Sequence, residues 1–445
     1  MSARPTQLYD VAVLGGALPG VVAAALLAQR GLRVLHVAPT APGSYESGGF
    51  RLPLAPELLP ATKILPALRE SLDELSLAAV VNRSLQPISA QVVLPRARLE
   101  LREERELQRA FGGEAAGVAG ALARLAASVE EFAPAVGGPL LPQGLGERFA
   151  SWRHRRSNRT LLEAPLVLDG AGPMEAALLA LHHFTAADAS PPNAVAFARA
   201  TAPLLHGFHR LPEGGLAAHL VGHVRARRGD ALVAKVDEIA LEGSRFAGLQ
   251  IKGELWRART LIAALPASEL VALLPESRRR DKLAAQAEAA TATPLHLRSI
   301  VLAAQGLPPG LGPLAVVAGF GGGEVLLEQR PALRSDGKED PSLQILTALS
   351  TAGGDALEAI LEEVLPFHRR HVRHEATPPS HPARYELAGE RPFGFEGVSP
   401  RTALPGVLLG GPELLPGLGL EGAFLAGRRL AQAIQAITGR EKKSV

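Results

Sequence analysis

The sequence contains no cysteine among its 445 residues. This absence excludes a disulfide framework, a thiolate metal site, a redox-active Cys-x-x-Cys pair and attachment of a cofactor through cysteine. Aromatic residues are also scarce, at 4% of the chain, although 47% of the residues are hydrophobic. This composition favours helices of small residues packed on sheets, and the length is enough for two or three structural modules.

An excess of charge of one sign is also missing. Lys and Arg number 47 against 44 Asp and Glu, so the pI of 9.4 does not by itself indicate a nucleic-acid partner. Two short basic runs occur at 153–159 and 278–282. Because neither run interleaves aromatic residues at stacking intervals, we expect exposed faces rather than nucleic-acid grooves, and no nucleic-acid partner.

The N-terminal region has no uninterrupted apolar run. Residues 1–10 are polar, and the apolar stretch that follows is broken by Gly15, Gly16, Pro19 and Gly20. This pattern fits neither a signal peptide nor a membrane span. We therefore expect a cytoplasmic protein without a transmembrane segment, for which peripheral contact with a membrane stays open.

The first forty residues predict a βαβ unit. Residues 10–14 read as a buried strand, 15–20 as a tight glycine turn, 21–29 as a helix and 33–37 as a second strand. In a dinucleotide-binding unit of this order, the first glycine allows the turn, the second lets a pyrophosphate approach, and the third lets helix and strand pack closely. The segment therefore predicts an α/β fold with a right-handed parallel crossover.

The glycine turn departs from this pattern. Gly15, Gly16 and Gly20 are present, whereas Ala17 occupies the second position of the pattern, where its methyl group narrows the gap for a phosphate. At the end of the second strand, Ala38 stands where an acidic residue would accept hydrogen bonds from a ribose. The amides and positive dipole end of the helix attract a phosphate without any side chain, so the phosphate site is weakened and not closed.

Two later segments add a resemblance to the flavoprotein superfamily of amine oxidases, phytoene desaturases and protoporphyrinogen oxidases. The loop that ends in Gly49-Phe50-Arg51 resembles the Gly-Gly-Arg-like loop that follows the second strand in that superfamily. Residues 209–266 look like its central block, with a Pro-x-Gly-Gly turn, a helix, a strand at 234–239 and a strand ending in Ala-x-Pro. The resemblance implies an FAD cofactor whose adenine lies beside Val236.

Residues 406–422, with a helix at about 423–437, are similar to the closing motif of the same superfamily, which places backbone amides against the flavin. In many members an Asp after the glycine turn binds the ribityl chain. Here Pro412, which has no N–H and no acceptor side chain, occupies that place beside Glu413. The resemblance implies that Gly411, Glu413 and Gly419 lie at the cofactor.

By this resemblance the fold is α/β, with an FAD/NAD(P)-binding Rossmann-like domain and an interleaved α+β substrate domain. The first domain is predicted at 1–61, 184–266 and 374–440, the second at 62–183 and 267–373, and a basic tail at 441–445. Apolar spacing predicts helices at 118–132, 174–184 and 355–364, strands at 297–303 and 324–328, and loops at 308–323 and 334–341.

Three histidines, His368, His371 and His374, recur at a spacing of three that would align them on one helix. A metal site is conceivable, but the neighbouring arginines would repel a cation and no carboxylate partner is evident. We therefore predict a solvated basic segment and no metal. No Ser/His/Asp set or pair of carboxylates is defined by order alone, so the sequence assigns no catalytic residue.

Two functions follow from these patterns. The first is an FAD-dependent oxidoreductase of the dehydrogenase or desaturase type that acts on a small apolar or lipid-like substrate, because few tyrosines and tryptophans are available to build an aromatic cage for an amine. The second is a flavin-free pseudoenzyme comparable to the Rab GDP-dissociation inhibitors, a scaffold that binds proteins or lipids. Ala17, Ala38 and Pro412 favour the second function, whereas phosphate binding by main-chain amides keeps the first.

Overall fold

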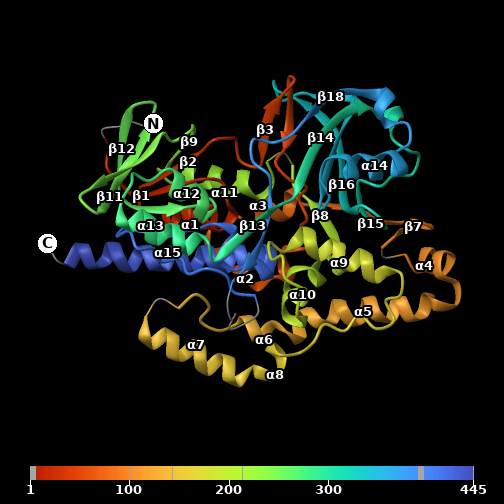
Figure 1. Cartoon of the computed structure of the whole chain (residues 1–445), viewed down its shortest axis with the longest axis horizontal. Helices are drawn as coiled ribbons and strands as arrows, with labels where there is room; N and C mark the ends of the chain where they lie inside the picture. Colours follow the sequence, from red (N-terminus) through yellow and green to blue (C-terminus); the bar gives the residue numbers. More distant parts are fainter. Residues whose placement is uncertain (1–6, 102, 143, 213, 389–394, 444–445) are drawn as a thin grey trace.

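The computed structural model describes residues 7–101, 103–142, 144–212, 214–388 and 395–443. Two large sheets lie at opposite ends of the molecule, and helix α15 (Gly419–Lys443) runs beneath the first of them (Figure 1). The predicted tail is helical at 441–443, whereas residues 444–445, the first six residues and Glu213 of the Pro-x-Gly-Gly turn lie outside the described residues.

The first sheet has seven strands in the order β10-β11-β12-β1-β2-β9, with β20 beside β12. Its parallel part consists of β1 (Tyr9–Leu14), β2 (Val34–Ala38), β9 (Asp230–Val233), β12 (Glu254–Ala263) and β20 (Val407–Leu409). An antiparallel hairpin, β10 (Glu238–Glu242) and β11 (Arg245–Ile251), extends this sheet from β12.

Helix α1 (Leu18–Gln29) connects β1 to β2 and is apolar on all sides. Its residues 19–28 are buried because α11 (Gly215–Ala226) and α15 both contact it. The predicted strand, glycine turn, helix and strand are therefore confirmed, with the helix beginning three residues earlier than the sequence indicated.

The second sheet has nine strands, in the order β18-β14-β17-β16-β15-β6-β7 with β3 and β4 attached at β16. Their bounds are β3 (Ser44–Ser47), β4 (Phe50–Pro53), β6 (Ala90–Leu94), β7 (Ala97–Glu100), β14 (His296–Ala303), β15 (Leu314–Phe320), β16 (Gly323–Arg334), β17 (Glu339–Ser350) and β18 (Val372–Ala376). Segments 44–53 and 372–376, which the predicted division assigns wholly or partly to the first domain, thus join this sheet, and the domain boundaries stay a prediction.

The remaining elements surround the two sheets. The helices are α2 (Pro66–Glu74), α3 (Ala78–Ser84), α4 (Glu104–Phe111), α5 (Ala115–Glu131), α6 (Ala133–Val136), α7 (Leu145–Ser157), α8 (Arg159–Leu162), α9 (Met174–Thr185), α10 (Ala194–Ala200), α12 (Ala267–Ala272), α13 (Arg278–Ala287) and α14 (Gly354–Val364). Two small antiparallel pairs join β5 (Gln86–Ile88) to β8 (Phe208–Arg210) and β13 (Ala290–Pro294) to β19 (Ala383–Leu387). Among the described residues, no helix combines the length and the apolar composition that a membrane span requires.

Three sequence predictions of local structure are wholly or partly wrong. The predicted loop at 334–341 is confined to 335–338, because β16 ends at Arg334 and β17 begins at Glu339. The predicted loop at 308–323 contains β15, because its apolar residues 314–318 are buried between β16 and β6 despite the prolines and glycines on either side. The predicted strand at 234–239 is interrupted at 234–237. There the amide of Ala234 bonds to Ala38 and the amide of Asp237 to Gln250, so the chain crosses from the parallel strands to the β10–β11 hairpin.

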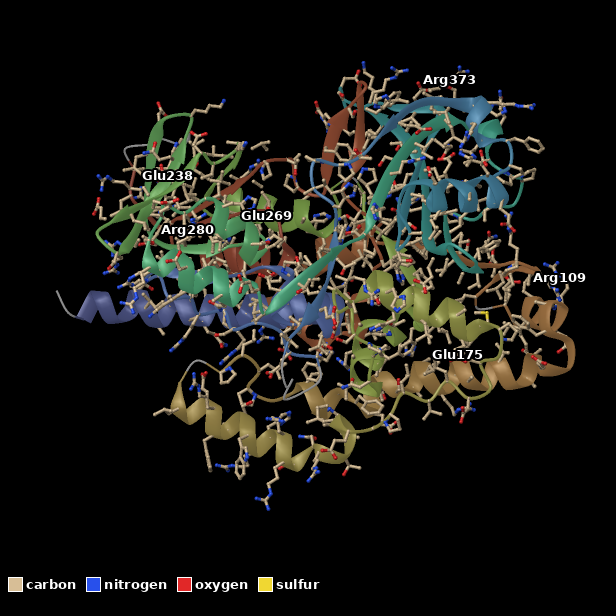
Figure 2. All side chains as sticks on the ribbon, viewed as in Figure 1. Arg109, Glu175, Glu238, Glu269, Arg280 and Arg373 are labelled. Atoms are coloured by element: carbon tan, nitrogen blue, oxygen red, sulfur yellow. The ribbon has the colours of Figure 1, made fainter. Side chains whose placement is uncertain are left out.

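Each sheet has its own buried apolar core. The larger core surrounds the first sheet and includes α1, α11 and α15. A second core lies between the other sheet and helices α5 and α9. Figure 2 shows the contrast with the periphery, where charged side chains such as Glu238 of β10 and Arg373 of β18 lie on the sides of the first and the second sheet.

Candidate cofactor and ligand cavity

A cavity of about 720 Å³ lies between the first sheet's crossover helix and the second sheet. It is within the size range of small-molecule and cofactor pockets. Its wall is formed by the α1 turn, residues 51–60, the start of α11, strand β16 and the start of α15. Most of the lining side chains are apolar, and they include Leu52, Leu54, Leu58, Leu204 and Leu211.

Two glycines of the first turn are required by close packing. Gly15 has φ +106°, and a Cβ built on it would lie 2.2 Å from the carbonyl oxygen of Ala264. A Cβ on Gly20 would lie 2.2 Å from the Cβ of Ala264, at the end of β12. Gly16, by contrast, has open space where a side chain would begin, and it lines the cavity. The turn thus has the predicted glycine roles in tight turning and in helix–strand packing.

The main-chain donors of this turn are mostly engaged within the protein. The amides of Gly15, Ala17 and Gly20 donate to the carbonyls of Val37, Ala264 and Gly410, at 2.8, 2.9 and 3.1 Å. The residue at position 19 is a proline and has no N–H. The amides at positions 16 and 18 have no backbone acceptor among the described residues, and both residues line the cavity. Two amides are therefore available to an anionic group there.

Helix α15 presents its first turn to the same cavity, through Gly419, Leu420 and Ala423. The amides of a helix's first turn have no partner within the helix, and they form the positive end of its dipole. The buried carboxylate of Glu421 in this turn accepts two hydrogen bonds of 2.6 Å from Arg199 of α10. This ion pair fixes the end of α15 against the neighbouring helix.

Glu413 and Gly411, two predicted cofactor residues, do not line this cavity. Glu413 is 1% exposed, and its Oε1 accepts a 3.0 Å hydrogen bond from the amide of Ala267 at the start of α12. A Cβ on Gly411 would lie 2.1 Å from Oε2 of Glu413, so this glycine makes room for the carboxyl group. Burial raises the pKa of Glu413 to about 7. The residue therefore caps a helix that packs against the core of the first sheet.

The region predicted to hold adenine lies outside the cavity lining. Val236 is 4% exposed and packs its side chain into the first core. Among the described residues, neither its amide nor its carbonyl has a backbone hydrogen-bond partner. Ala38 is buried, and its carbonyl accepts the amide of Ala234.

Arg51, another predicted cofactor residue, does line the cavity. It lies on β4, and its Nη2 donates a 2.9 Å hydrogen bond to the carbonyl of Ser335. Gly49 precedes this strand with φ +81°, a conformation that favours glycine, and its carbonyl accepts the amide of Ser335. Of the predicted cofactor residues, the cavity thus brings together Gly16, Arg51 and Gly419, whereas Gly15, Ala17, Gly20, Gly49, Val236, Gly411 and Glu413 are not part of its lining.

Sequence reasoning missed a polar group in the cavity formed by Glu57, Arg210 and Arg330. Arg330 pairs at 2.7 Å with Glu328, which is fully buried, and Arg210 donates to the carbonyl of Gln329 at 3.1 Å. Burial raises the pKa values of both glutamates, whereas burial and the neighbouring Arg330 lower the pKa of Arg210.

The signal that could have found this group is a charged residue inside an apolar segment. Glu328 follows Val325-Leu326-Leu327 on β16, and Glu57 is surrounded by leucines and prolines. The carboxylate of Glu57 accepts the amides of Leu211 and Leu216. It therefore binds the N-terminal end of α11.

The three histidines do not align on one helix. His368 and His371 lie in a 3-10 turn, whereas His374 lies on β18 and bonds to Ser47 at 2.9 Å. The prediction of a solvated segment is wrong for His368, which is 2% exposed and bonds through Nδ1 to the carbonyl of Leu365. Among the described residues, no group of three His, Cys, Asp or Glu side chains is arranged to hold a metal ion.

No protein-family model matches the sequence, and no curated protein matches it. Solved structures match over nearly the whole chain. An oxidoreductase from Methanosarcina mazei is 15% identical with a TM-score of 0.57, and the match covers 95% of this chain and 100% of that one. Cyclohexylamine oxidase from Brevibacterium oxydans is 16% identical with a TM-score of 0.54, over 97% and 99% of the two chains.

The Rab GDI from Plasmodium falciparum is also similar, at 10% identity and a TM-score of 0.54, over 91% of this chain and 92% of that one. These likenesses show the fold. The chain has the architecture that amine oxidases share with Rab GDI, as the resemblance in the sequence predicted, and the α/β fold class is confirmed.

Proposed function

We propose that this protein is an FAD-dependent oxidoreductase that acts on an apolar or lipid-like substrate. The observation that carries the proposal is the position of the cavity, which is bounded by the N-terminal turns of both α1 and α15. Two helix N-termini facing one space form an environment suited to phosphate groups and to a ring that gains negative charge on reduction.

The residues that would hold the cofactor follow from the cavity lining. The amides of Gly16 and Leu18 are available to a diphosphate, and the guanidinium of Arg51 adds a positive charge to the same space. The first turn of α15 lies on another part of the wall. Gly16 leaves room for close approach, since no atom lies within 4 Å of the point where a Cβ would be. These residues fit the diphosphate and ring portions of FAD.

The leucine-rich wall accounts for the proposed substrate class. A bound flavin accepts a hydride, and the protein supplies shape, orientation and exclusion of water. The side chains of Leu52, Leu54, Leu58 and Leu333 provide an apolar surface, and Arg210 and Arg330 provide one polar end. An elongated apolar molecule that carries a polar group at one end is the substrate class that suits this arrangement.

The test is the cofactor content of the purified protein, followed by its uptake of added FAD. We expect a flavin absorbance band and quenching of FAD fluorescence on binding. Gly16→Asp should weaken FAD binding by at least tenfold, because a carboxylate in the cavity wall repels a diphosphate. Gly113→Asp is the matched control, since Gly113 also has open space around it and lies outside the cavity lining. Equal affinities for the two variants, or colourless protein that takes up no FAD, would overturn the proposal.

A flavin-free scaffold that binds an apolar ligand is the second candidate. The observation that favours it is Ala38, which is buried and carries no acid for a ribose. The engaged amides of Ala17 and Gly20 also reduce the number of donors available to a phosphate. Colourless protein that takes up a fluorescent fatty acid and no FAD would establish this candidate instead.

A further inference from the structure

Helix α7 (Leu145–Ser157) lies at the outer edge of the molecule, away from both sheets (Figure 1). Its inner face is attached at a few points. Ser151 is its buried residue, Nε2 of His154 bonds to the carbonyl of Ala135 at 3.0 Å, and Glu147 pairs with Arg429 of α15 at 2.7 Å. The side chains of its outer face project away from the molecule (Figure 2).

An apolar stripe runs along this outer face. Leu145 is 84% exposed, Phe149 56% and Trp152 50%. Their spacing of four and three residues places them on one side of the helix. These are three of the eight large apolar side chains that are exposed in the described part of the chain, so exposed apolar groups are concentrated on one short helix.

Arginines flank the stripe. The guanidinium of Arg153 lies 5.2 Å from the ring centre of Phe149, and that of Arg156 lies 5.8 Å from the ring centre of Trp152. The acid of the helix, Glu147, faces inward in its ion pair, so the outer face is positively charged. The predicted exposure of this basic run is confirmed for Arg153, Arg156 and Arg159. The run itself contains no aromatic residue, as predicted, but the rings of Phe149 and Trp152 precede it and lie one turn before two of its arginines.

We propose that α7 is a membrane-docking helix that lies in the surface of an anionic lipid bilayer. Helices of this kind combine Trp, Phe and Leu on one face with arginines that contact the headgroups. Arginine side chains beside the rings can extend to the lipid phosphates while the rings enter the acyl boundary. A nucleic acid fits less well, because the rings of Phe149 and Trp152 already stack on each other at 5.7 Å and Leu145 offers no stacking surface.

The first test is co-sedimentation of the full chain with vesicles. We expect binding to vesicles of phosphatidylglycerol and phosphatidylcholine in equal parts, and weaker binding to phosphatidylcholine alone. The double variant Phe149→Ser, Trp152→Ser should lower the partition coefficient by about tenfold or more. Phe367→Ser is the matched control, because Phe367 is 65% exposed and lies on the second sheet's side of the chain.

The contribution of the arginine charges to vesicle binding is tested separately. Arg153→Gln with Arg156→Gln should lower binding to the anionic vesicles by about tenfold and make it less sensitive to salt. Arg278→Gln with Lys282→Gln is the control, since both residues are exposed at the start of α13. Equal losses in the two double variants would mean that general charge, and not α7, causes binding.

Tryptophan fluorescence locates the contact. Trp152 and Trp256 are the chain's two tryptophans, and Trp256 is 7% exposed in the first core. Vesicle binding should shift the emission to shorter wavelength, and Trp152→Phe should remove that shift. Binding that leaves the emission unchanged, or retention on single-stranded RNA without binding to vesicles, would overturn the proposal. None of these measurements depends on FAD, so they can fail while the proposed oxidoreductase function stands.

Discussion

Glu413 combines burial with an incomplete set of hydrogen bonds. Its Oε1 accepts the amide of Ala267, whereas its Oε2 has no partner in the described part of the chain. Burial is the main cause of its raised pKa, and Glu269 adds a like charge nearby. Burial raises the pKa of Tyr385, and the charges of Glu413 and Glu269 raise it further. The residue is thus held in its neutral form more readily than a surface glutamate.

This arrangement predicts a pH-dependent stability. The folded-state pKa of about 7 lies above the ordinary glutamate pKa of 4.5, so the folded protein binds this proton more tightly than the unfolded chain does. The stabilisation is complete below pH 4.5 and is lost as the pH rises through 7. Glu413→Gln, which keeps the acceptor for Ala267, should therefore gain up to about 3 kcal/mol in unfolding free energy, relative to the wild type, between pH 5 and pH 8.

Urea unfolding of both proteins at the two pH values measures this gain. Glu276→Gln, at an exposed position, serves as the control and should change little with pH. If the wild type and Glu413→Gln differed in unfolding free energy by the same amount at pH 5 and pH 8, this result would contradict the raised pKa of Glu413.

The sequence could not show this role for Glu413. The pattern of strand, glycine turn and helix from residue 406 onward was recognised in the correct order, and it placed Glu413 beside the cofactor. The carboxyl group instead faces Ala267, which is 146 residues away in the chain. A side chain's direction depends on the local turn, here a 3-10 turn at 412–414, and this turn is set by packing that the pattern of residue types does not record.

At the scale of elements, the crossover helix α1 is positioned by a glycine that contacts Ala264, the residue immediately after β12. Gly20 leaves room for Ala264, and any Cβ at position 20 would collide with the Cβ of Ala264. Gly20→Ala should therefore destabilise the protein by about 2 kcal/mol, the cost of overpacking a tight helix–strand contact. Gly16→Ala is the matched control in the same turn, because its Cβ would meet nothing within 4 Å.

A double-mutant cycle tests the physical cause. Ala264→Gly introduced together with Gly20→Ala should recover much of the loss, because it removes the colliding methyl group. Unfolding free energies from urea titrations supply the four values. If the two substitutions destabilise additively, the contact between α1 and β12 is not the reason for glycine at this position.

The elements that the sequence predicted well are those with local patterns. The β1–α1–β2 unit, α9 and α14 follow from apolar periodicity and from glycine at a turn. Strand β15 was missed because Pro308, Gly310 and Gly319 are typical of loops, although the residues between them are buried by long-range pairing with β6. That partner lies more than two hundred residues earlier, so its influence is absent from any local window.

At the scale of the whole molecule, the chain passes repeatedly between the two sheets. Strands β1 and β2 belong to the first sheet, β3 and β4 to the second, and β9 to β12 to the first again. The cavity is lined by residues from both regions, such as Gly16 and Arg330. Residues so far apart in sequence meet only because the two sheets are assembled, which is why the polar group of Glu57, Arg210 and Arg330 could not be predicted.

Because the chain passes repeatedly between the two sheets, we predict that their two cores unfold together. Leu326 is fully buried on β16 in the second core, and Leu326→Ala should cost about 2–5 kcal/mol through the cavity that it leaves. In a Trp152→Phe background, Trp256 is the remaining tryptophan and reports on the first core. We expect Leu326→Ala to lower the urea midpoint of Trp256 fluorescence as much as that of the far-ultraviolet circular dichroism, because two-state unfolding gives the same midpoint for every probe.

Leu145→Ala, at an exposed position, should leave both midpoints unchanged. If Leu326→Ala left the urea midpoint of Trp256 fluorescence unchanged, while circular dichroism showed a transition at lower urea concentration, the second sheet would unfold on its own.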